Sequence, residues 1–246
     1  MPVIDKQELD EIARRYHANA DVPDKHIEDL CQRFCTNWIL STLIPGTRIL
    51  ELGFGEGIVT QALVEAGMNV TVIEGSQILH DQIRAEYDSR VIAVHALFEE
   101  YTTDATFDVV LASHVLEHVE DPVGLLRRIK PWLTPNGRLI VIVPNRESLH
   151  RRLAVFMGLQ TELDTLSQRD HLVGHRRVYS HESLARDLLD GGFRTTGATG
   201  FFLKSLPNSM MLEYSEALLW AMNQIAPQLP KELLANIGVI AVPIQS

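Results

Sequence analysis

The sequence predicts an α/β fold, built on a doubly wound and mostly parallel sheet with helices on both faces. Two observations predict it. From Thr47 onward, short runs rich in Val, Ile and Leu alternate with helical patterns. These runs are almost continuously apolar, which is typical of strands that are buried on both faces of a parallel sheet. The short turns between them favour successive right-handed crossovers.

We expect seven strands, with helices between most of them. Asp121 followed by Pro122 indicates one helix start and Ser180 indicates another, because these residue types favour the first positions of helices. Gly191 and Gly192 should end the second of these helices. The predicted strands cover residues 48–53, 69–75, 90–96, 107–114, 137–145, 193–203 and 235–243. The predicted helices between them cover residues 57–67, 76–87, 121–133, 180–193 and 209–225.

Two segments lie outside this alternation. Residues 1–45 are expected to form an N-terminal helical lid on a domain of residues 46–246, since helical patterns cover residues 5–18 and 24–43. Residues 146–180 follow the fifth strand, are rich in Arg and His, and show little strand pattern. We expect this second segment to be an insert in the domain.

Composition narrows the class of protein. The formal net charge of −10 and the pI of about 5.4 disfavour a nucleic-acid partner. No apolar run approaches the roughly 20 residues of a membrane span, and the N-terminus lacks a signal-peptide core. Cys31 and Cys35 lack the second pair that a zinc site needs, so we expect buried thiols and no metal. These features predict a cytoplasmic monomer or homodimer without a membrane span.

Three glycines stand at the end of the first predicted strand and in the turn after it, at Gly53, Gly55 and Gly57. A nucleotide-binding βαβ unit needs glycine at this turn, so that the ligand can approach the backbone and the helix N-terminus. Glu74 ends the second strand, where a carboxylate can accept hydrogen bonds from both ribose hydroxyls. Ile58 stands where a dinucleotide fingerprint has its third glycine. The alternative is that the glycines only permit helix packing and that Glu74 is solvated.

Three stretches of the chain resemble the class I S-adenosylmethionine-dependent methyltransferases. They read ILELGFGEG, VTVIEGS and FDVVLASHVLEHVEDPVGLLRRIKPWLTPNGRLIVIVPN. The closest likeness is to the small-molecule branch, which includes ubiquinone O-methyltransferases and natural-product and sugar methyltransferases. It covers roughly residues 47–145, and residues 175–193 match a helix that the branch carries after its acceptor insert. The resemblance implies a Rossmann-like sheet of seven strands whose last strand is antiparallel.

The resemblance also implies a cofactor and its binding residues. The cofactor is S-adenosyl-L-methionine, and S-adenosyl-L-homocysteine is the product. The glycine turn would lie against its methionine part, the acid after the second strand would bind its ribose, and the first helix would fold over it. The loop after the third strand lacks the usual acidic residue, so it would act through backbone and packing. The implied residues are Tyr16, Glu51, Gly53, Gly55, Gly57, Glu74, Gly75, Ser76, Ala96, Leu97, Ser113 and His114. For His118, in the LEHV segment, we expect helix packing.

The insert 146–180 is where relatives bind the acceptor, and it forms a local basic island. Its arginines suit an acceptor with an anionic group, and the alternative is a solvated face with local ion pairs. If the acceptor is a hydroxyl, a histidine can act as general base. We rank His171 first, His175 second and His150 third, with Asp170 available to orient one of them. The arginines are Arg146, Arg151, Arg152, Arg169, Arg176 and Arg177.

The sequence therefore predicts an enzyme that transfers methyl from S-adenosylmethionine to a small-molecule acceptor, such as an anionic metabolite, a sugar or a natural-product intermediate. The VPN end of the fifth strand lacks the NPPY or DPPY signature of amide and adenine N-methyltransferases, which favours a hydroxyl oxygen. Orientation of donor and acceptor can supply much of the catalysis without a metal. The alternatives are N- or C-methylation, a nicotinamide-dependent oxidoreductase, and a non-catalytic scaffold that binds the same cofactor.

Overall fold

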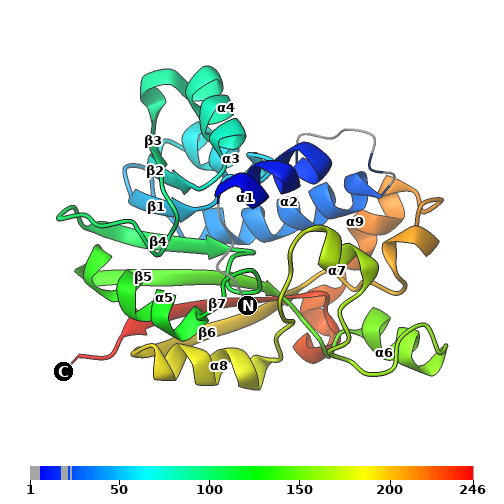
Figure 1. Ribbon diagram of the computed structural model, residues 1–246. Helices are drawn as coiled ribbons and strands as arrows, with labels where there is room; N and C mark the ends of the chain where they lie inside the picture. Colours follow the sequence, from blue (N-terminus) through cyan, green and yellow to red (C-terminus); the bar gives the residue numbers. More distant parts are fainter. Residues whose placement is uncertain (1–5, 18–21, 23, 246) are drawn as a thin grey trace.

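The computed structural model describes residues 6–17, 22 and 24–245. They build a single seven-stranded sheet of strand order β3-β2-β1-β4-β5-β7-β6 (Figure 1). The last strand along the chain runs antiparallel to both of its neighbours, and the other neighbouring pairs are parallel. The predicted fold class is confirmed. The strands are β1 (Arg48–Leu52), β2 (Asn69–Glu74), β3 (Val91–His95), β4 (Phe107–Ser113), β5 (Leu133–Pro144), β6 (Phe193–Phe201) and β7 (Asn236–Pro243).

Helices cover both faces of the sheet (Figure 1). In chain order they are α1 (Lys6–Ile12), which continues as the π-helical turn η1 (Ala13–His17), α2 (Lys25–Ser41), α3 (Ile58–Glu65), α4 (Gln77–Tyr87), α5 (Pro122–Ile129), α6 (Leu149–Phe156), α7 (Gln168–Leu172), α8 (His181–Asp190) and α9 (Glu216–Gln224). Short 3₁₀ turns are η2 (Asp88–Arg90), η3 (Lys130–Trp132), η4 (Asn208–Met210), η5 (Ala226–Gln228) and η6 (Lys231–Leu233).

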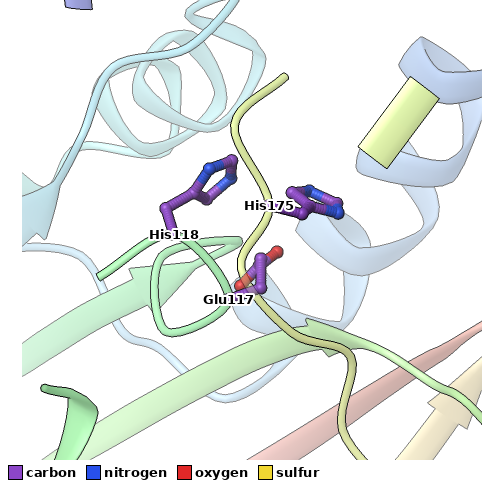
Figure 2. Close-up of side chains that lie close together, drawn as sticks. All are labelled: Glu117, His118 and His175. Carbon is purple, nitrogen blue, oxygen red and sulfur yellow. The ribbon is translucent and has the colours of Figure 1, made fainter. Parts of the chain in front are cut away.

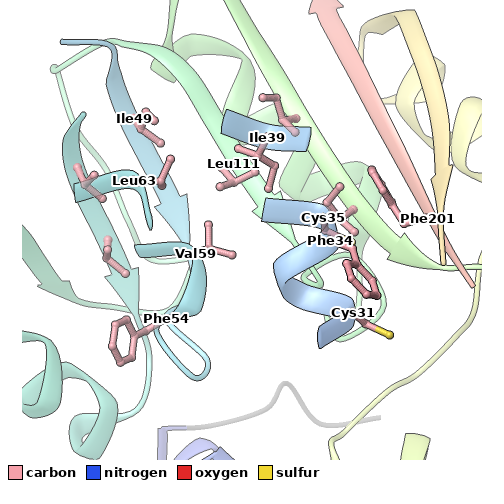
Figure 3. Close-up of a cluster of buried hydrophobic side chains, with 14 of the residues drawn as sticks. Cys31, Phe34, Cys35, Ile39, Ile49, Phe54, Val59, Leu63, Leu111 and Phe201 are labelled. Carbon is pink, nitrogen blue, oxygen red and sulfur yellow. The ribbon is translucent and has the colours of Figure 1, made fainter. Parts of the chain in front are cut away.

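The apolar strands contribute side chains to two separate hydrophobic cores. Ile49 and Leu111 belong to the core that α2, α3, α4 and α9 cover, where they share a cluster with Phe34 of α2 (Figure 3). The neighbouring strand residues Leu50 and Val110 belong to the other core, under α5 and α8. Successive residues of a strand point to opposite faces, so only a continuous apolar run can fill both cores.

Two of the predicted helix starts are confirmed at the level of single hydrogen bonds. The side chain of Asp121 accepts from the backbone N–H of Gly124 at 2.8 Å, directly before Pro122 at the first position of α5. Ser180 caps α8 in a capping box with Ser183. These caps satisfy N–H groups that the first turn of a helix leaves without partners.

The prediction of one helix over residues 209–225 is wrong in its first half. The chain forms the short turn η4 and then α9, which begins only at Glu216. Ser215 caps α9 by accepting from the backbone N–H of Leu218, and it fixes the start of the helix there. Before that cap, Met211 is fully buried in the core under α2. Burial of this side chain outweighs the local helical pattern.

The N-terminal helices and the insert lie beside one another above the carboxyl ends of the strands. Arg15 of η1 donates to the backbone carbonyl of Leu172 in α7 at 2.8 Å. Ser76, at the start of α4, donates to Asp10 of α1 at 2.6 Å. The predicted limits of the first helix, residues 5 and 18, lie outside the described residues. Within the described ranges, every helix is too short or too polar to cross a membrane.

Candidate functional site

A cavity of about 1120 Å³ lies at the carboxyl ends of the parallel strands. The strand order reverses between β1 and β4, and this switch point is where α/β sheets bind ligands. Gly53 after β1, Glu74 of β2, Ser113 of β4 and Pro144 of β5 all line the cavity. Residues of α1, α2, α6 and α7 line its other sides. The volume is sufficient for a nucleoside and a second small molecule.

The turn after β1 depends on glycine. Gly53, Gly55 and Gly57 have φ angles of 78°, 55° and 75°, a left-handed region that other residues rarely adopt. A Cβ on Gly57 would lie 2.6 Å from the ring of Phe54. Gly53 and Gly55 line the cavity, whereas Gly57 stands one step behind it as the N-cap of α3. The turn thus presents bare backbone to the cavity.

Replacing Gly57 by alanine should damage both the fold and the cavity, because alanine at this φ costs about 1–2 kcal/mol and the clash with Phe54 adds about 1–3 kcal/mol. Gly46 is the matched control, since it has a φ of 86° and open space around a Cβ. Gly46→Ala should lower Tm by several degrees, and Gly57→Ala by about twice as much. Thermal unfolding measures both changes. Equal Tm values would contradict the role of Phe54.

Glu74 connects the end of β2 to the glycine turn. Its carboxylate accepts from the backbone N–H of Phe54 at 2.9 Å and from that of Ser76 at 2.7 Å. The side chain is buried, and burial raises its pKa although both backbone bonds oppose the change. Each carboxylate oxygen has more than one lone pair, so both can still accept from ligand hydroxyls. Glu74 therefore fixes the turn and faces the cavity at the same time.

Glu51 is a second buried carboxyl in the same half of the cavity. It accepts from the hydroxyl of Thr60 at 2.8 Å. Burial, together with the nearby charge of Glu74, raises the pKa of Glu51 to about 8, against the opposing effect of the Thr60 bond. Two carboxyls close together in a buried wall favour a cationic ligand.

The structure brings nearly all of the predicted cofactor residues together. Every one of them lines the cavity except Gly57. Tyr16 of η1 is buried, and its hydroxyl accepts from the guanidinium of Arg169 in α7. Gly75 and Ser76 stand at the start of α4, and Ala96 and Leu97 follow β3. Side chains from four strand ends and from the N-terminal helices thus surround one volume.

His114, at the end of β4, has an unusual backbone and an unusual ring. Its φ is 56°, a rare value for a residue with a side chain. Its Nδ1 lies 3.1 Å from Oε1 of the fully buried Glu117. Burial opposes a charged imidazole, but hydrogen bonds to Cys35 and Glu117 outweigh it and raise the pKa of His114 to about 10. His114 and Glu117 therefore form an ion pair at the wall of the cavity.

Glu117, His118 and His175 converge from two distant segments (Figure 2). One donor atom from each lies within 4.8 Å of the others, and no other such group of His, Cys, Asp or Glu occurs among residues 6–17, 22 and 24–245. These three side chains could hold a metal ion, a possibility that the sequence did not indicate. His118 stands in a turn and not in a helix, and its ring packs edge-on against that of His175 with centroids 4.7 Å apart.

The three histidines proposed as bases occupy different places. His175 lines the cavity, and its Nδ1 lies 2.8 Å from Oδ1 of Asp170. His150 also lines the cavity, and burial holds its pKa well below the usual value. His171 is exposed on α7 and does not line the cavity. The sequence indicated that Asp170 could orient one of these histidines, and the structure pairs it with His175.

Several arginines of the basic island have partners within the protein. Arg151 pairs with Asp170 at 2.8 Å, and Arg169 pairs with Asp24, directly before α2, and with Glu28 of α2. Arg177 donates to the backbone carbonyls of three residues in the turn after β4. These contacts match the local ion pairs of the alternative interpretation. An anionic acceptor stays a prediction.

Sequence reasoning missed Glu28 and Lys204, which both line the cavity. Lys204 lies 3.5 Å from Glu28, and Asn208 donates to the same carboxylate oxygen at 2.5 Å. Burial opposes the ionisation of Glu28, but Lys204, Arg169 and Asn208 outweigh it and lower its pKa. Glu28 is on α2 and its partners come from α7 and the segment after β6, so no local pattern could have revealed the group.

A family profile described as "Methyltransferase domain" matches residues 11–197. The mitochondrial ubiquinone biosynthesis O-methyltransferase of Schizosaccharomyces pombe is 32% identical over 119 residues, which cover 46% of this chain and 43% of that protein. The Bradyrhizobium diazoefficiens ubiquinone biosynthesis O-methyltransferase is 29% identical over 173 residues, or 69% of this chain and 67% of that protein. The match thus spans less than half of the first relative and about two thirds of the second.

Solved structures share the fold at lower identity. A possible histamine N-methyltransferase of Thermotoga maritima aligns with a TM-score of 0.63 and 21% identity, covering 95% of this chain and 99% of that one. The 1,6-didemethyltoxoflavin-N1-methyltransferase of Burkholderia thailandensis, solved with S-adenosylhomocysteine, aligns with a TM-score of 0.61 and 18% identity, covering 100% and 93%. At these identities, the likeness supports the architecture alone.

Proposed function

Because the chain belongs to the class I S-adenosylmethionine-dependent methyltransferases, we propose that it methylates a hydroxyl oxygen of a small-molecule acceptor. S-adenosylmethionine is the cofactor of this family, and when bound it supplies a methyl group on a positively charged sulfur. One observation carries the proposal. A single cavity joins the glycine turn and Glu74 on one side to the histidine-bearing insert on the other.

The half of the cavity beside β1 and β2 fits this cofactor. The turn at Gly53 and Gly55 offers backbone without side chains, and Glu74 offers two carboxylate oxygens for ribose hydroxyls. The buried carboxyls Glu51 and Glu74 favour a cationic molecule there. We propose that these residues bind the cofactor, together with Gly75, Ser76, Ala96, Leu97, Ser113, His114 and Tyr16, and that Gly57 supports the turn from behind.

We propose that α1, η1 and α2 act as a lid on this half. Arg169 contacts Tyr16 of η1 and Asp24 before α2, and Lys25 donates to the backbone carbonyls of Tyr16 and His17. The Arg169 contacts join the lid to the insert over the cavity, and the Lys25 bonds hold the lid helices to each other. Such closure excludes water and holds two bound molecules in a fixed orientation, which can supply much of the rate of methyl transfer.

His175 is the histidine that we place beside the reacting hydroxyl. Asp170 accepts from its Nδ1, which leaves Nε2 without the proton and able to take one. Asp170 is itself held by Arg151 and by the hydroxyl and N–H of Ser167. His150 is the second candidate, since it lines the cavity. His171 is the weakest, because its side chain lies outside.

The proposal is tested by binding and by turnover. Calorimetry with S-adenosylmethionine should show one site per chain. Incubation with matched panels of hydroxyl, amine and carbon-acid acceptors should release S-adenosylhomocysteine fastest from the hydroxyl panel. Release from amines or carbon acids alone would replace O-methylation by the other two chemistries. Binding without any release would favour the scaffold, and failure to bind would end the proposal.

Affinity for the cofactor should rise with pH toward a plateau near pH 8. The carboxyl of Glu51 is neutral below its pKa of about 8, and a bound cation favours its ionised form, so binding releases a proton. We expect roughly tenfold tighter binding at pH 8.5 than at pH 6.5, equivalent to about 1.4 kcal/mol. Calorimetry in buffers of different ionisation enthalpy measures both the affinity and the released proton.

Glu51→Gln is the control for this pH dependence, since glutamine keeps the shape of the side chain and cannot ionise. The variant should bind the cofactor with the same affinity at both pH values and should release no proton. An unchanged pH slope in this variant would assign the effect to another group.

A further inference from the structure

Glu117 has a carboxylate oxygen without a hydrogen-bond partner. The side chain is fully buried, and its Oε1 pairs with Nδ1 of His114 at 3.1 Å. Its Oε2 is also buried, and in the described part of the chain it has no hydrogen-bond partner. A buried charged oxygen left unpaired costs several kcal/mol, so this atom is suited to a cation.

Two imidazoles lie near the carboxylate of Glu117. His118 and His175 each bring a ring nitrogen to within 4.8 Å of the Glu117 donor atom and of one another (Figure 2). Nδ1 of His175 is occupied by Asp170, so Nε2 is the nitrogen that remains for a ligand bond. Two imidazole nitrogens and one carboxylate oxygen are a common donor set for first-row transition metals.

The residues behind the donors resemble the outer shell of a metal site. Asp170 accepts from His175, which orients the imidazole as carboxylates do behind metal-binding histidines. His114 holds Oε1 of Glu117 and leaves Oε2 directed elsewhere. Arg151 in turn fixes Asp170 at 2.8 Å. Both oriented donors thus have a partner that sets their direction before any ion arrives.

The backbone also holds the two segments in place. The N–H of Arg176 donates to the carbonyl of Glu117 at 2.8 Å, directly beside His175. The guanidinium of Arg177 donates to carbonyls on both sides of His118, at Leu116, Val119 and Glu120. The donors therefore sit on a preformed junction between the turn after β4 and the end of the insert.

We infer that Glu117, His118 and His175 bind a divalent transition-metal ion such as Zn²⁺ at the acceptor side of the cavity. His118 and His175 line the cavity, so an ion held by them would be accessible from it. The role of the ion in the reaction rests on the proposed function. An acceptor hydroxyl that binds to the ion loses its proton to water more readily. Its oxygen then bonds to the methyl carbon, and the sulfur keeps the electrons of the broken bond. Without the ion, Nε2 of His175 takes that proton.

The test uses the full-length protein stripped with a chelator, without cofactor or acceptor. Zn²⁺ is titrated by calorimetry and Co²⁺ by its visible absorption, which reports the geometry of the ligands. We expect one ion per chain. His118→Gln and His175→Gln should weaken binding by more than the roughly 10–100-fold expected of the outer-shell variant Asp170→Asn. His26→Gln, an exposed histidine on α2, is the matched control.

Two outcomes would overturn the inference: no ion bound by the stripped protein, or equal affinities in the His118, His175 and His26 variants. Affinity for S-adenosylmethionine, measured on each variant, shows that the fold is intact. Because ion binding is measured without turnover, a failure of methyl transfer leaves this result standing. Conversely, full turnover in the presence of the chelator would keep the methyltransferase and remove the ion from its reaction.

Discussion

Replacing His175 by glutamine should lower kcat for methyl transfer about a hundredfold, while affinity for S-adenosylmethionine stays the same. Loss of a positioned proton acceptor typically costs a factor of about 10²–10⁴. Glutamine keeps a polar group at the position but takes no proton at neutral pH. The residue lies outside the glycine turn and the acid of β2, so cofactor binding should not change. Steady-state release of S-adenosylhomocysteine and calorimetry measure the two quantities.

The same substitution separates the two roles available to His175. If the imidazole takes the proton itself, wild-type protein treated with chelator keeps its rate and the variant stays slow. If the imidazole holds an ion, chelation lowers the rate of the wild type, and the variant stays slower still because it lacks the proton acceptor as well. His26→Gln should match the wild type in both conditions. A His175→Gln protein with the full wild-type rate would contradict both roles.

Replacing Glu74 by alanine should weaken binding of S-adenosylmethionine about a hundredfold. The variant leaves two buried N–H groups, of Phe54 and Ser76, without their acceptor, which destabilises the glycine turn by about 1–3 kcal/mol for each group and disturbs its preformed shape. It also removes the oxygens proposed to accept from the ribose hydroxyls. A loss of about 2.7 kcal/mol corresponds to a factor of about 100 in Kd. Calorimetry at a fixed pH measures the change.

Glu65→Ala is the matched control for this prediction. Glu65 is exposed on α3, and its carboxylate accepts one hydrogen bond, from Gln61 at 2.9 Å. That variant should bind the cofactor like the wild type. Glu74→Gln should be intermediate, because the amide oxygen can still accept one of the two backbone bonds. Wild-type affinity in Glu74→Ala would remove the carboxylate from the cofactor site.

Where sequence reasoning succeeded, neighbouring residues set the structure. The strands follow from apolar runs that both cores require, and α5 begins at Pro122 because the side chain before it caps the helix. Prediction from the sequence failed where a distant contact outweighed a local pattern. Residues 209–215 have a helical pattern, yet burial of Met211 and the cap at Ser215 move the start of α9 to Glu216.

The two halves of the cavity also differ in how far the sequence predicts them: neighbouring residues set the cofactor half, and distant contacts set the acceptor half. Gly53, Gly55 and Gly57 need φ angles that only glycine adopts cheaply, so their spacing after a strand already predicts the turn. His171 and His175 stand four residues apart, and no pattern tells which one faces the cavity. Asp170 pairs with the second of them, and Arg151 and Arg169, proposed as anion-binding groups, are held by acids.

The sequence by itself determined the doubly wound, mostly parallel sheet, the glycine turn and the acid at the end of β2, because backbone conformation and two-sided burial are encoded by contiguous residues. The tertiary structure alone decided which histidine reaches the cavity, and that Glu117 and His118 meet His175. These side chains come from the turn after β4 and from the end of the insert. Their distances depend on how two distant segments pack, and packing is a property of the whole fold.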